Sequence, residues 1–385
     1  MITKLTFLST KFNVLFLCGW YPSKVSPNNG DFIQRHAEAV SLNHKVTVIH
    51  IITDKKTKKN IDYSSEQING IETHIAYLKY SNNPLKKIFL FIKAFKVLLL
   101  KSGAIDVVHL NEIFPFGIFS LYLKWFKKKP YIISEHYTGY HYPQSKNITF
   151  LQKFISSIIT KNASVVCPVS NDLKNSIQKL GLKGKYYRMP NVVDTALFFP
   201  IPKTPTIFTI THISNMVNNH KNIEGIIRVI KKLENEIDDF RFKFIGENAE
   251  MYIPFAKKTG INLDKTIFID HVSHEEIATN LKESNLFVLF SNYENLPCVI
   301  LEAFSCGVPV ISTNVGGVSE YFPKDFGFLI NSNDEDTLLH KIIEVHTHFK
   351  TDKEKMHNYV KKNFSKTTIA NQFSELYNSA LNKSL

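Results

Sequence analysis

The sequence predicts an α/β protein with two doubly wound, Rossmann-like domains that face each other across a cleft. Three observations lead to this fold class. Short apolar runs alternate with helical patterns along both halves of the chain, which indicates parallel sheets covered by helices on both faces. The 385 residues suffice for two domains of ordinary size. The proline-rich stretch 200–205 has the composition of a linker.

The apolar runs place the strands of both halves. In the first half, strands are predicted at 13–17, 46–51, 71–77, 106–110, 131–134 and 164–169, and in the second half at 207–213, 241–245, 266–269, 286–290 and 308–313. Helices are predicted between them at 31–42, 84–101, 118–127, 150–161, 221–234, 273–283 and 336–347. The predicted domains are therefore 1–199 and 206–365, joined by the linker 200–205.

Composition excludes several classes of protein. A hydrophobic content of 44% with a mean hydropathy of −0.11 is typical of a soluble globular protein. The four cysteines include no CxxC pair, which favours buried thiols in a reducing, cytoplasmic compartment. Residues 1–13 lack the uninterrupted apolar region of a signal peptide, so we expect a short tail there. The net charge of +13 permits a nucleic-acid partner, but no nucleic-acid-binding module is recognisable.

The most informative stretch runs from Glu294 to Glu302. Pro297 suits the first turn of a helix and Gly307 suits its end, so Glu294 should lie in the loop before this helix and Glu302 inside it. At ~1.5 Å per residue, the two carboxylates would lie roughly 10 Å apart along the helix axis.

This spacing suits an elongated ligand that crosses a helix N-terminus. Free backbone N–H groups of Asn295, Leu296 and Cys298, next to Pro297, would face an anion between the two acids. Carboxylates accept hydrogen bonds from sugar hydroxyls, and amides suit phosphates. The pattern therefore predicts a site for a nucleoside diphosphate sugar.

These residues carry a resemblance to a known family. Ser291-x-Tyr293-Glu294 through Glu302-Ala303, Gly307-x-Pro309-Val310 and Gly316-Gly317-x-x-Glu320 resemble the signature of retaining glycosyltransferases of family 4, which have the GT-B fold. The resemblance implies that Glu294 contacts the donor sugar and Glu302 holds the ribose. It also implies a nucleotide sugar as co-substrate, no cofactor and no metal, and a C-terminal helix at about 366–385 that packs back on an N-terminal, acceptor-binding domain.

Other residues match the family pattern less closely. Gly30 opens a helix after the first strand, like the family's glycine-containing donor loop, and His136 follows a strand end where the family has a histidine near the reacting centre. Lys221 matches a lysine that clamps the diphosphate. Asn215 stands where the family has a clamping arginine, and it supplies no charge.

No metal site is predicted. Asp334-Glu335-Asp336 resembles a DxD metal motif, but its place at the start of a helix favours capping. The segment 271–276 lacks the spacing of a zinc-binding HExxH motif.

Two segments predict contact with a membrane. Pro84–Lys101 is apolar with interspersed lysines, too charged to span a bilayer, and Leu121–Lys129 adds an aromatic and basic cluster. Together they suggest peripheral contact with an anionic inner membrane face, although the first segment is equally compatible with an ordinary core helix.

The sequence thus predicts a metal-independent, retaining glycosyltransferase that acts on a glycan or polyprenyl-linked acceptor in cell-surface polysaccharide synthesis. Two alternatives remain open. A nucleotide-sugar epimerase of the same fold would turn over donor without an acceptor. A non-enzymic sugar-nucleotide-binding protein would bind donor without turnover.

Overall fold

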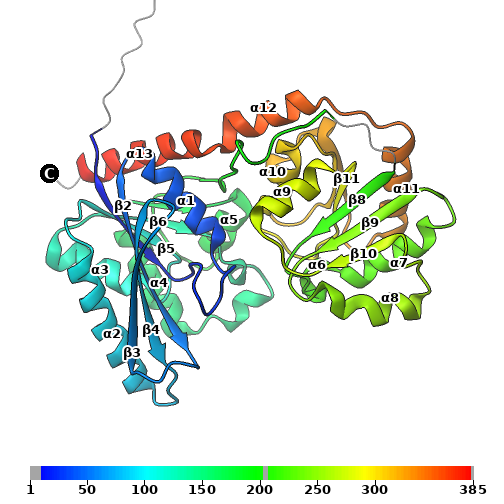
Figure 1. Ribbon diagram of the computed structural model, residues 1–385. Coiled ribbons are helices and arrows are strands. Elements are labelled where there is room, and N and C mark those ends of the chain that lie inside the picture. Colours follow the sequence, from blue (N-terminus) through cyan, green and yellow to red (C-terminus); the bar gives the residue numbers. More distant parts are fainter. Residues whose placement is uncertain (1–9, 203–206, 383–385) are drawn as a thin grey trace, which may run out of the picture. The chain divides into compact units, whose positions relative to one another are not determined.

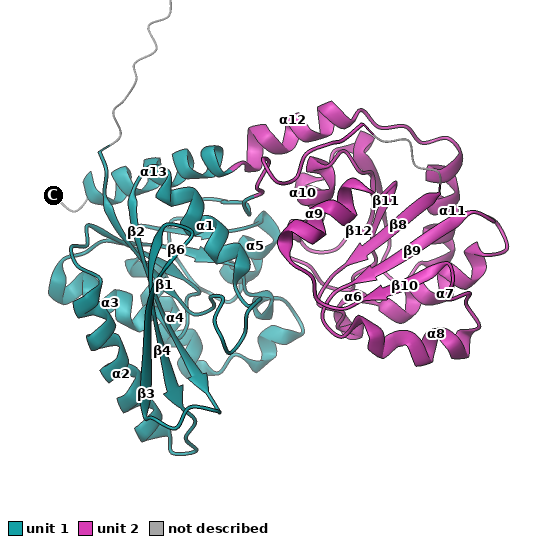
Figure 2. Cartoon of the chain, viewed as in Figure 1, with its two compact units in different colours: residues 1–192, 366–385 teal, residues 193–365 magenta. Residues whose placement is uncertain are grey.

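The computed structural model describes residues 10–202 and 207–382. The chain divides into two compact units, coloured separately in Figure 2: unit 1 comprises Met1–Val192 and Lys366–Leu385, and unit 2 comprises Val193–Ser365. The predicted linker 200–205 lies partly outside the described residues, and so does most of the predicted N-terminal tail.

The described part of unit 1 contains a seven-stranded sheet in the order β3-β4-β2-β1-β5-β6-β7 (Figure 1). Its strands are β1 (Asn13–Cys18), β2 (Lys45–Asp54), β3 (Ile61–Ile68), β4 (Ile71–Lys79), β5 (Val107–Asn111), β6 (Tyr131–Glu135) and β7 (Val165–Pro168). Every pairing is parallel except that of β3 with β4, which form an antiparallel hairpin at the sheet edge. The prediction of an all-parallel sheet is therefore wrong at this edge.

Helices cover both faces of this sheet (Figure 1). They are α1 (Asp31–Ser41), α2 (Pro84–Lys101), α3 (Gly117–Lys127), α4 (Phe150–Asn162), α5 (Asn171–Lys179) and α13 (Lys366–Asn382). The last helix belongs to this core, because Ile369, Phe373 and Tyr377 are fully buried against β1 and α1. The Tyr377 hydroxyl also lies 2.7 Å from Nδ1 of His109 on β5.

The described part of unit 2 contains a parallel six-stranded sheet in the order β10-β9-β8-β11-β12-β13. Its strands are β8 (Phe208–Ile213), β9 (Phe240–Ile245), β10 (Thr266–Ile269), β11 (Leu286–Leu289), β12 (Val310–Thr313) and β13 (Gly327–Ile330). The strand order reverses between β8 and β11. Ligands of such sheets bind at the carboxyl ends of the strands beside this reversal.

The helices of unit 2 also lie on both faces (Figure 1). They are α6 (Asn218–Lys221), α7 (Ile223–Leu233), α8 (Ile253–Thr259), α9 (His274–Lys282), α10 (Cys298–Ser305), α11 (Glu335–Thr347) and α12 (Lys353–Phe364). The core on one side of the sheet joins α7, α8 and α11 to the strands. Figure 1 shows α9, α10 and α12 on the other side.

Several elements differ from the prediction. The predicted helix 221–234 is divided into α6 and α7, because Asn222 adopts a left-handed conformation with φ 49° and caps α7 through its side chain. Helix α10 begins at Cys298, with Pro297 as its N-cap rather than inside its first turn. The strands β3 and β13 and the helices α5, α8 and α12 were not predicted.

Candidate functional site

The candidate donor site lies at the carboxyl ends of β8 and β11 in unit 2. The loop after β8 leads into α6, which ends at Lys221, and the loop after β11 contains Glu294 and leads into α10. These two strands are neighbours at the reversal of the strand order. The topology therefore explains why residues 73 positions apart in the sequence meet at one place.

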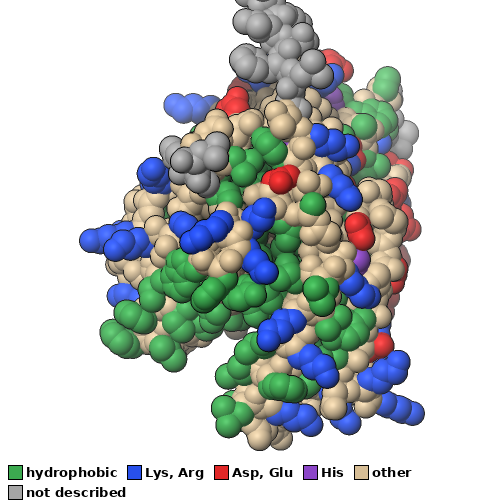
Figure 3. Space-filling view, turned by 90° about the vertical axis from the view of Figure 1, so that its left-hand side faces the viewer, with side chains coloured by type: hydrophobic (Ala, Val, Ile, Leu, Met, Phe, Trp, Pro, Cys, Tyr) green, Lys and Arg blue, Asp and Glu red, His purple; other side chains and the backbone are tan. Residues whose placement is uncertain are grey.

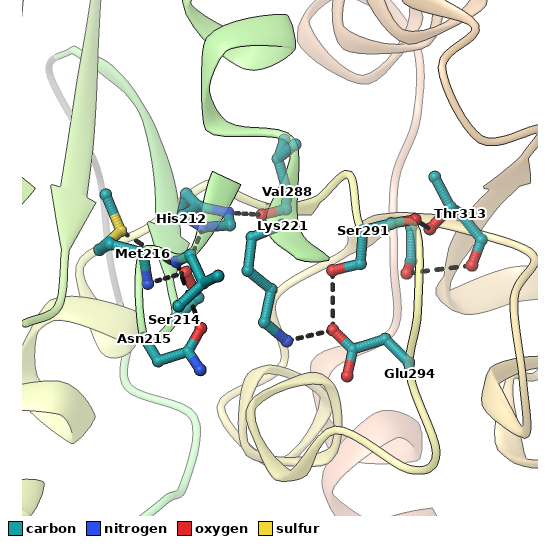
Figure 4. A network of polar contacts seen from close by, with 11 residues as sticks. His212, Ser214, Asn215, Met216, Lys221, Val288, Ser291, Glu294 and Thr313 are labelled. Atoms are coloured by element: carbon teal, nitrogen blue, oxygen red, sulfur yellow. Dashed lines mark hydrogen bonds and ion pairs between the residues drawn. The ribbon is translucent and has the colours of Figure 1, made fainter. Parts of the chain in front are cut away.

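Lys221 and Glu294 form an ion pair between Nζ and Oε1 (Figure 4). The same carboxylate oxygen accepts a hydrogen bond of 2.7 Å from Oγ of Ser291. The two charged side chains are only 15% and 8% exposed. The sequence assigned Lys221 to the diphosphate and Glu294 to the sugar; the structure joins them in one partly buried polar cluster.

Backbone contacts hold the two loops together around this pair. The backbone N–H of Asn292 donates to the carbonyl of His220 at 2.7 Å, and the Asn292 side-chain amide donates to the carbonyl of Asn219 at 3.1 Å. On the other side, Oγ1 of Thr313, at the end of β12, donates to the carbonyl of Ser291 at 2.6 Å (Figure 4). The position of Lys221 opposite Glu294 is thus determined by several bonds besides the ion pair itself.

A glycine turn after β12 closes against the Glu294 backbone. Gly316 has φ +57°, and a Cβ added there would lie 1.7 Å from the carbonyl oxygen of Glu294. The next residue, Gly317, donates its N–H to the carbonyl of Asn295 at 3.0 Å. Only glycine permits both this backbone conformation and this close approach.

The predicted anion-binding segment precedes α10. Asn295 and Leu296 are buried, whereas Pro297 and Cys298 are partly exposed. The residues therefore form the approach to the helix N-terminus, as the sequence predicted, although the helix itself begins one residue later than predicted.

Glu302 lies within α10 and is 3% exposed. Its Oε1 lies 3.2 Å from Nε2 of His274, the first residue of α9. The His274 ring packs edge-on against Phe198, with ring centroids 4.9 Å apart. His274 was not assigned a role from the sequence, because its distance of 28 residues from Glu302 gives no periodic signal.

The β8 loop contains Asn215, which takes the place of the family's arginine. It is exposed, and its Oδ1 accepts a long bond of 3.4 Å from the N–H of Val217. The loop itself is anchored by His212, whose Nδ1 lies 2.9 Å from the carbonyl of Val288 and whose Nε2 lies 2.8 Å from Oγ of Ser214 (Figure 4). Burial lowers the pKa of His212 to about 4, so this anchor is a neutral imidazole.

The remaining candidates, Gly30 and His136, belong to unit 1. Gly30 caps α1 with φ +80°, and a Cβ there would lie 2.7 Å from the carbonyl carbon of Trp20. Its close approach is therefore to the chain's own backbone. His136 follows β6 and packs on Phe32 of α1, with ring centroids 4.5 Å apart. Burial lowers the pKa of His136 well below its usual value, as do the nearby rings of His36 and His109.

A pair of acids beside His136 was not predicted. Glu112 follows β5 with φ +85°, unusual for a residue with a side chain, and a Cβ on Gly19 would lie 1.9 Å from its Oε2. Glu135, fully buried at the end of β6, accepts from the N–H groups of Ile113, His136 and Tyr137 at 2.8–2.9 Å. Burial and the Glu135 carboxyl raise the pKa of Glu112 to about 9.

The acidic run at 334–336 has the capping role that its position predicted. Asp334 caps α11 by accepting from the N–H of Thr337 at 3.1 Å, and Asp336 pairs with Lys232. Among the described residues, no group of three or more His, Cys, Asp or Glu side chains is arranged to hold a metal ion.

Two family models match consecutive parts of the chain. The model for glycosyltransferase family 4 matches residues 34–197, and the model for glycosyl transferases group 1 matches residues 197–365. The second match includes the complete donor-site cluster of unit 2.

Individual relatives agree with this assignment. One phosphatidylinositol N-acetylglucosaminyltransferase chain from Arabidopsis thaliana is 29% identical over 222 residues, which are 56% of this chain and 49% of the relative; the match therefore spans about half of that protein. The UDP-Gal:α-D-GlcNAc-diphosphoundecaprenol α-1,3-galactosyltransferase from Escherichia coli is 26% identical over 64% of this chain and 68% of its own length.

The fold is also that of solved structures. Sucrose-phosphate synthase from Thermosynechococcus elongatus superposes with a TM-score of 0.75 at 18% identity, over 97% of this chain and all of the other. The two family models, the relatives and this shared fold lead to one conclusion: the chain is a glycosyltransferase that belongs to family 4 and has the GT-B fold.

Proposed function

We propose that this glycosyltransferase moves a sugar from a nucleoside diphosphate sugar to a glycan or polyprenyl-linked acceptor, with retention of anomeric configuration and without a metal ion. The observation that carries the proposal is the cluster of Lys221, Glu294 and Glu302 around the approach to α10 in unit 2. It combines a cation, two carboxylates and a helix N-terminus, which together suit a diphosphate between two hydroxyl-rich sugars.

The chemistry follows from these groups. The bond between the sugar and the diphosphate breaks, and negative charge develops on the departing phosphate oxygen. Lys221 and the backbone N–H groups between Asn295 and Cys298 would stabilise that charge. Glu294 would orient the donor sugar through its hydroxyls, and Glu302, held by His274, would bind the ribose.

The roles of the unit 1 residues rest on the family resemblance. His136 is assigned to the reacting centre and Gly30 to the donor loop. The low pKa of His136 supports a neutral imidazole there, able to hydrogen-bond a sugar hydroxyl without adding charge.

The remaining parts of the proposal concern the partners. We propose a cytoplasmic enzyme in peripheral contact with an anionic membrane through the segments 84–101 and 121–129. All four cysteines are free, and three of them are buried, which agrees with a reducing compartment. Within the described residues, no helix combines the length and the apolar character needed to cross a bilayer. The lipid-linked class of acceptor agrees with the name of the Escherichia coli relative.

A screen and a product analysis test the function. Nucleotide sugars that raise the melting temperature would be incubated with the enzyme, and hydrolysis or transfer products analysed by NMR. We expect one donor to release its nucleoside diphosphate and a sugar of unchanged anomeric configuration. Inverted products would contradict the retaining mechanism. Conversion to an epimer without an acceptor would favour the epimerase, and binding without any turnover would favour a binding protein.

A further inference from the structure

The net positive charge of the protein is confined to unit 1. By sequence, unit 1 has 29 Lys and Arg residues against 11 Asp and Glu, a net charge of +18, whereas unit 2 has 18 against 23, a net charge of −5; the two values give the total of +13. A partner attracted by the net charge would therefore bind unit 1.

Helix α2 exposes an apolar stripe on its outer side. Leu85, Phe89 and Ile92, at the spacing i, i+4 and i+7, are 75%, 63% and 44% exposed. The opposite side of the same helix is buried through residues such as Ala94 and Leu98. The helix is thus apolar on both sides although only one side contacts the protein core. Of the two interpretations left open by the sequence, an ordinary core helix does not account for this outer stripe.

Helix α3 continues the apolar surface. Its outer residues follow the same helical spacing, and each is more than a third exposed: Ile118, Tyr122, Trp125 and Phe126. The helix lies beside α2, because Phe95 of α2 and Phe119 of α3 stack with ring centroids 4.0 Å apart. Helix α4 packs on α3, where Ile159 contacts Gly117, and exposes Phe150, Leu151 and Phe154 near its start.

The charged residues of these helices are all of one sign. Helices α2, α3 and α4 contain nine lysines and no Asp or Glu. Figure 3 shows hydrophobic side chains gathered in a broad patch with Lys and Arg side chains around it. We call the outer residues of α2, α3 and α4 the three-helix surface. Aromatic and aliphatic side chains within a rim of lysines are the composition of proteins that lie in a membrane interface.

We propose that the three-helix surface inserts its apolar side chains into the interfacial region of an anionic phospholipid bilayer while its lysines contact the lipid phosphates. A nucleic acid would match the lysines but would leave the aliphatic side chains in water. The proposal deepens the membrane contact proposed above: it adds α4 and predicts insertion in addition to charge attraction, and it is independent of the donor site in unit 2.

Insertion and attraction respond differently to salt. Charge attraction between lysines and lipid phosphates is screened at high ionic strength, whereas burial of apolar side chains is not. We therefore expect binding that is strong at low salt and reduced, yet still measurable, at high salt.

The test is sedimentation of the full chain with vesicles of phosphatidylcholine alone or with about a third of phosphatidylglycerol. The apolar variant is Phe89→Ser with Phe126→Ser, and its control is Met251→Ser, an exposed residue of unit 2. The lysine variant replaces Lys86, Lys87, Lys93 and Lys96 by Gln. Its control replaces four lysines of unit 2 by Gln: Lys257, Lys258, Lys324 and Lys350.

We expect the wild type to bind anionic vesicles at least tenfold more strongly than neutral ones. The lysine variant should lose about tenfold at low salt, and the apolar variant should lose the binding that remains at high salt. Both controls should bind like the wild type. The proposal is overturned if the wild type sediments with neither vesicle, if either variant binds like the wild type, or if a control loses as much as its matched variant. Donor binding measured without vesicles should be unchanged in every variant, which separates this result from the proposed function.

Discussion

The ammonium group of Lys221 is paired with Oε1 of Glu294, although the two residues stand in loops after different strands of unit 2. The pair is poorly hydrated, since the side chains are 15% and 8% exposed. In such surroundings, each charge stabilises the other and is costly when left alone.

We expect Lys221→Met to lower the free energy of unfolding by about 1–3 kcal/mol, because the Glu294 carboxylate would lose its cation while remaining mostly buried. The double variant with Glu294→Gln should recover much of this loss without recovering transfer activity. Urea denaturation of both single variants and the double variant gives the coupling energy. The exposed pair Lys341–Glu344 is the control, expected to couple by less than about 1 kcal/mol. A coupling for Lys221–Glu294 no larger than this control would contradict the account.

The raised pKa of Glu112 makes a second prediction. The folded protein holds the Glu112 proton up to a pH of about 9, whereas the unfolded chain releases it near the usual glutamate pKa of 4.5. The folded state therefore binds more protons in this window, and the Glu112 contribution to stability falls as pH rises from about 4.5 to 9.

Glu112→Gln should remove this loss. We expect its melting temperature to exceed that of the wild type at pH 8.5 by more than it does at pH 5, with about 2–4 °C for each kcal/mol. Glu375→Gln, at an exposed position of α13 in the same unit, is the control and should show no such dependence. A constant difference between Glu112→Gln and the wild type across this range would show that the carboxyl ionises normally.

Gly316 makes a third prediction. Gly316→Ala introduces a Cβ that would lie 1.7 Å from the carbonyl oxygen of Glu294, so the donor-site loop must move. Gly260→Ala is a matched control in the same unit, since Gly260 has a similar φ of +76° but no atom within 4 Å of the added Cβ. The control should cost only the strain of a left-handed residue, about 1–2 kcal/mol. Gly316→Ala should cost more and also weaken donor binding, as measured by calorimetry. Equal effects of the two substitutions would show that the contact with Glu294 is unimportant.

Local sequence patterns predicted the part of the donor site that is continuous in the chain. A strand, a proline, a helix and a glycine in succession place Glu294 before α10 and Glu302 inside it, because each signal acts on its own neighbours. The same reasoning failed for β3, whose polar residues lack the apolar alternation of a buried strand, since this edge strand pairs on one side only.

Contacts between distant loops could not be predicted in this way. The pairing of Lys221 with Glu294 depends on the adjacency of β8 and β11, and the contact of His274 with Glu302 depends on how α9 packs beside α10. Glu112 and Glu135 meet because β5 and β6 are neighbours that end at the same sheet edge. Sequence spacing contains none of this information, because tertiary packing sets it.

Metal independence is a fourth prediction. We assign the neutralisation of the leaving diphosphate to Lys221 and to backbone N–H groups, so EDTA should leave transfer activity unchanged. Activity would be measured as release of nucleoside diphosphate, before and after the chelator and after addition of Mg²⁺ or Mn²⁺. Loss of activity in EDTA that a divalent cation restores would refute this assignment.

The central claim is that unit 2 binds a nucleoside diphosphate through Glu302 and the approach to α10. Isothermal titration of UDP, GDP, ADP and dTDP into the wild type and into Glu302→Ala tests it most directly. We expect one of the four to bind at one site per chain, and Glu302→Ala to weaken that binding by about 1.5–3 kcal/mol, roughly 10- to 150-fold in Kd, because the ribose hydroxyls lose a charged acceptor. His274→Ala should have a smaller effect of the same sign. Unchanged affinity in a folded Glu302→Ala protein, or no binding of any of the four to the wild type, would contradict the account.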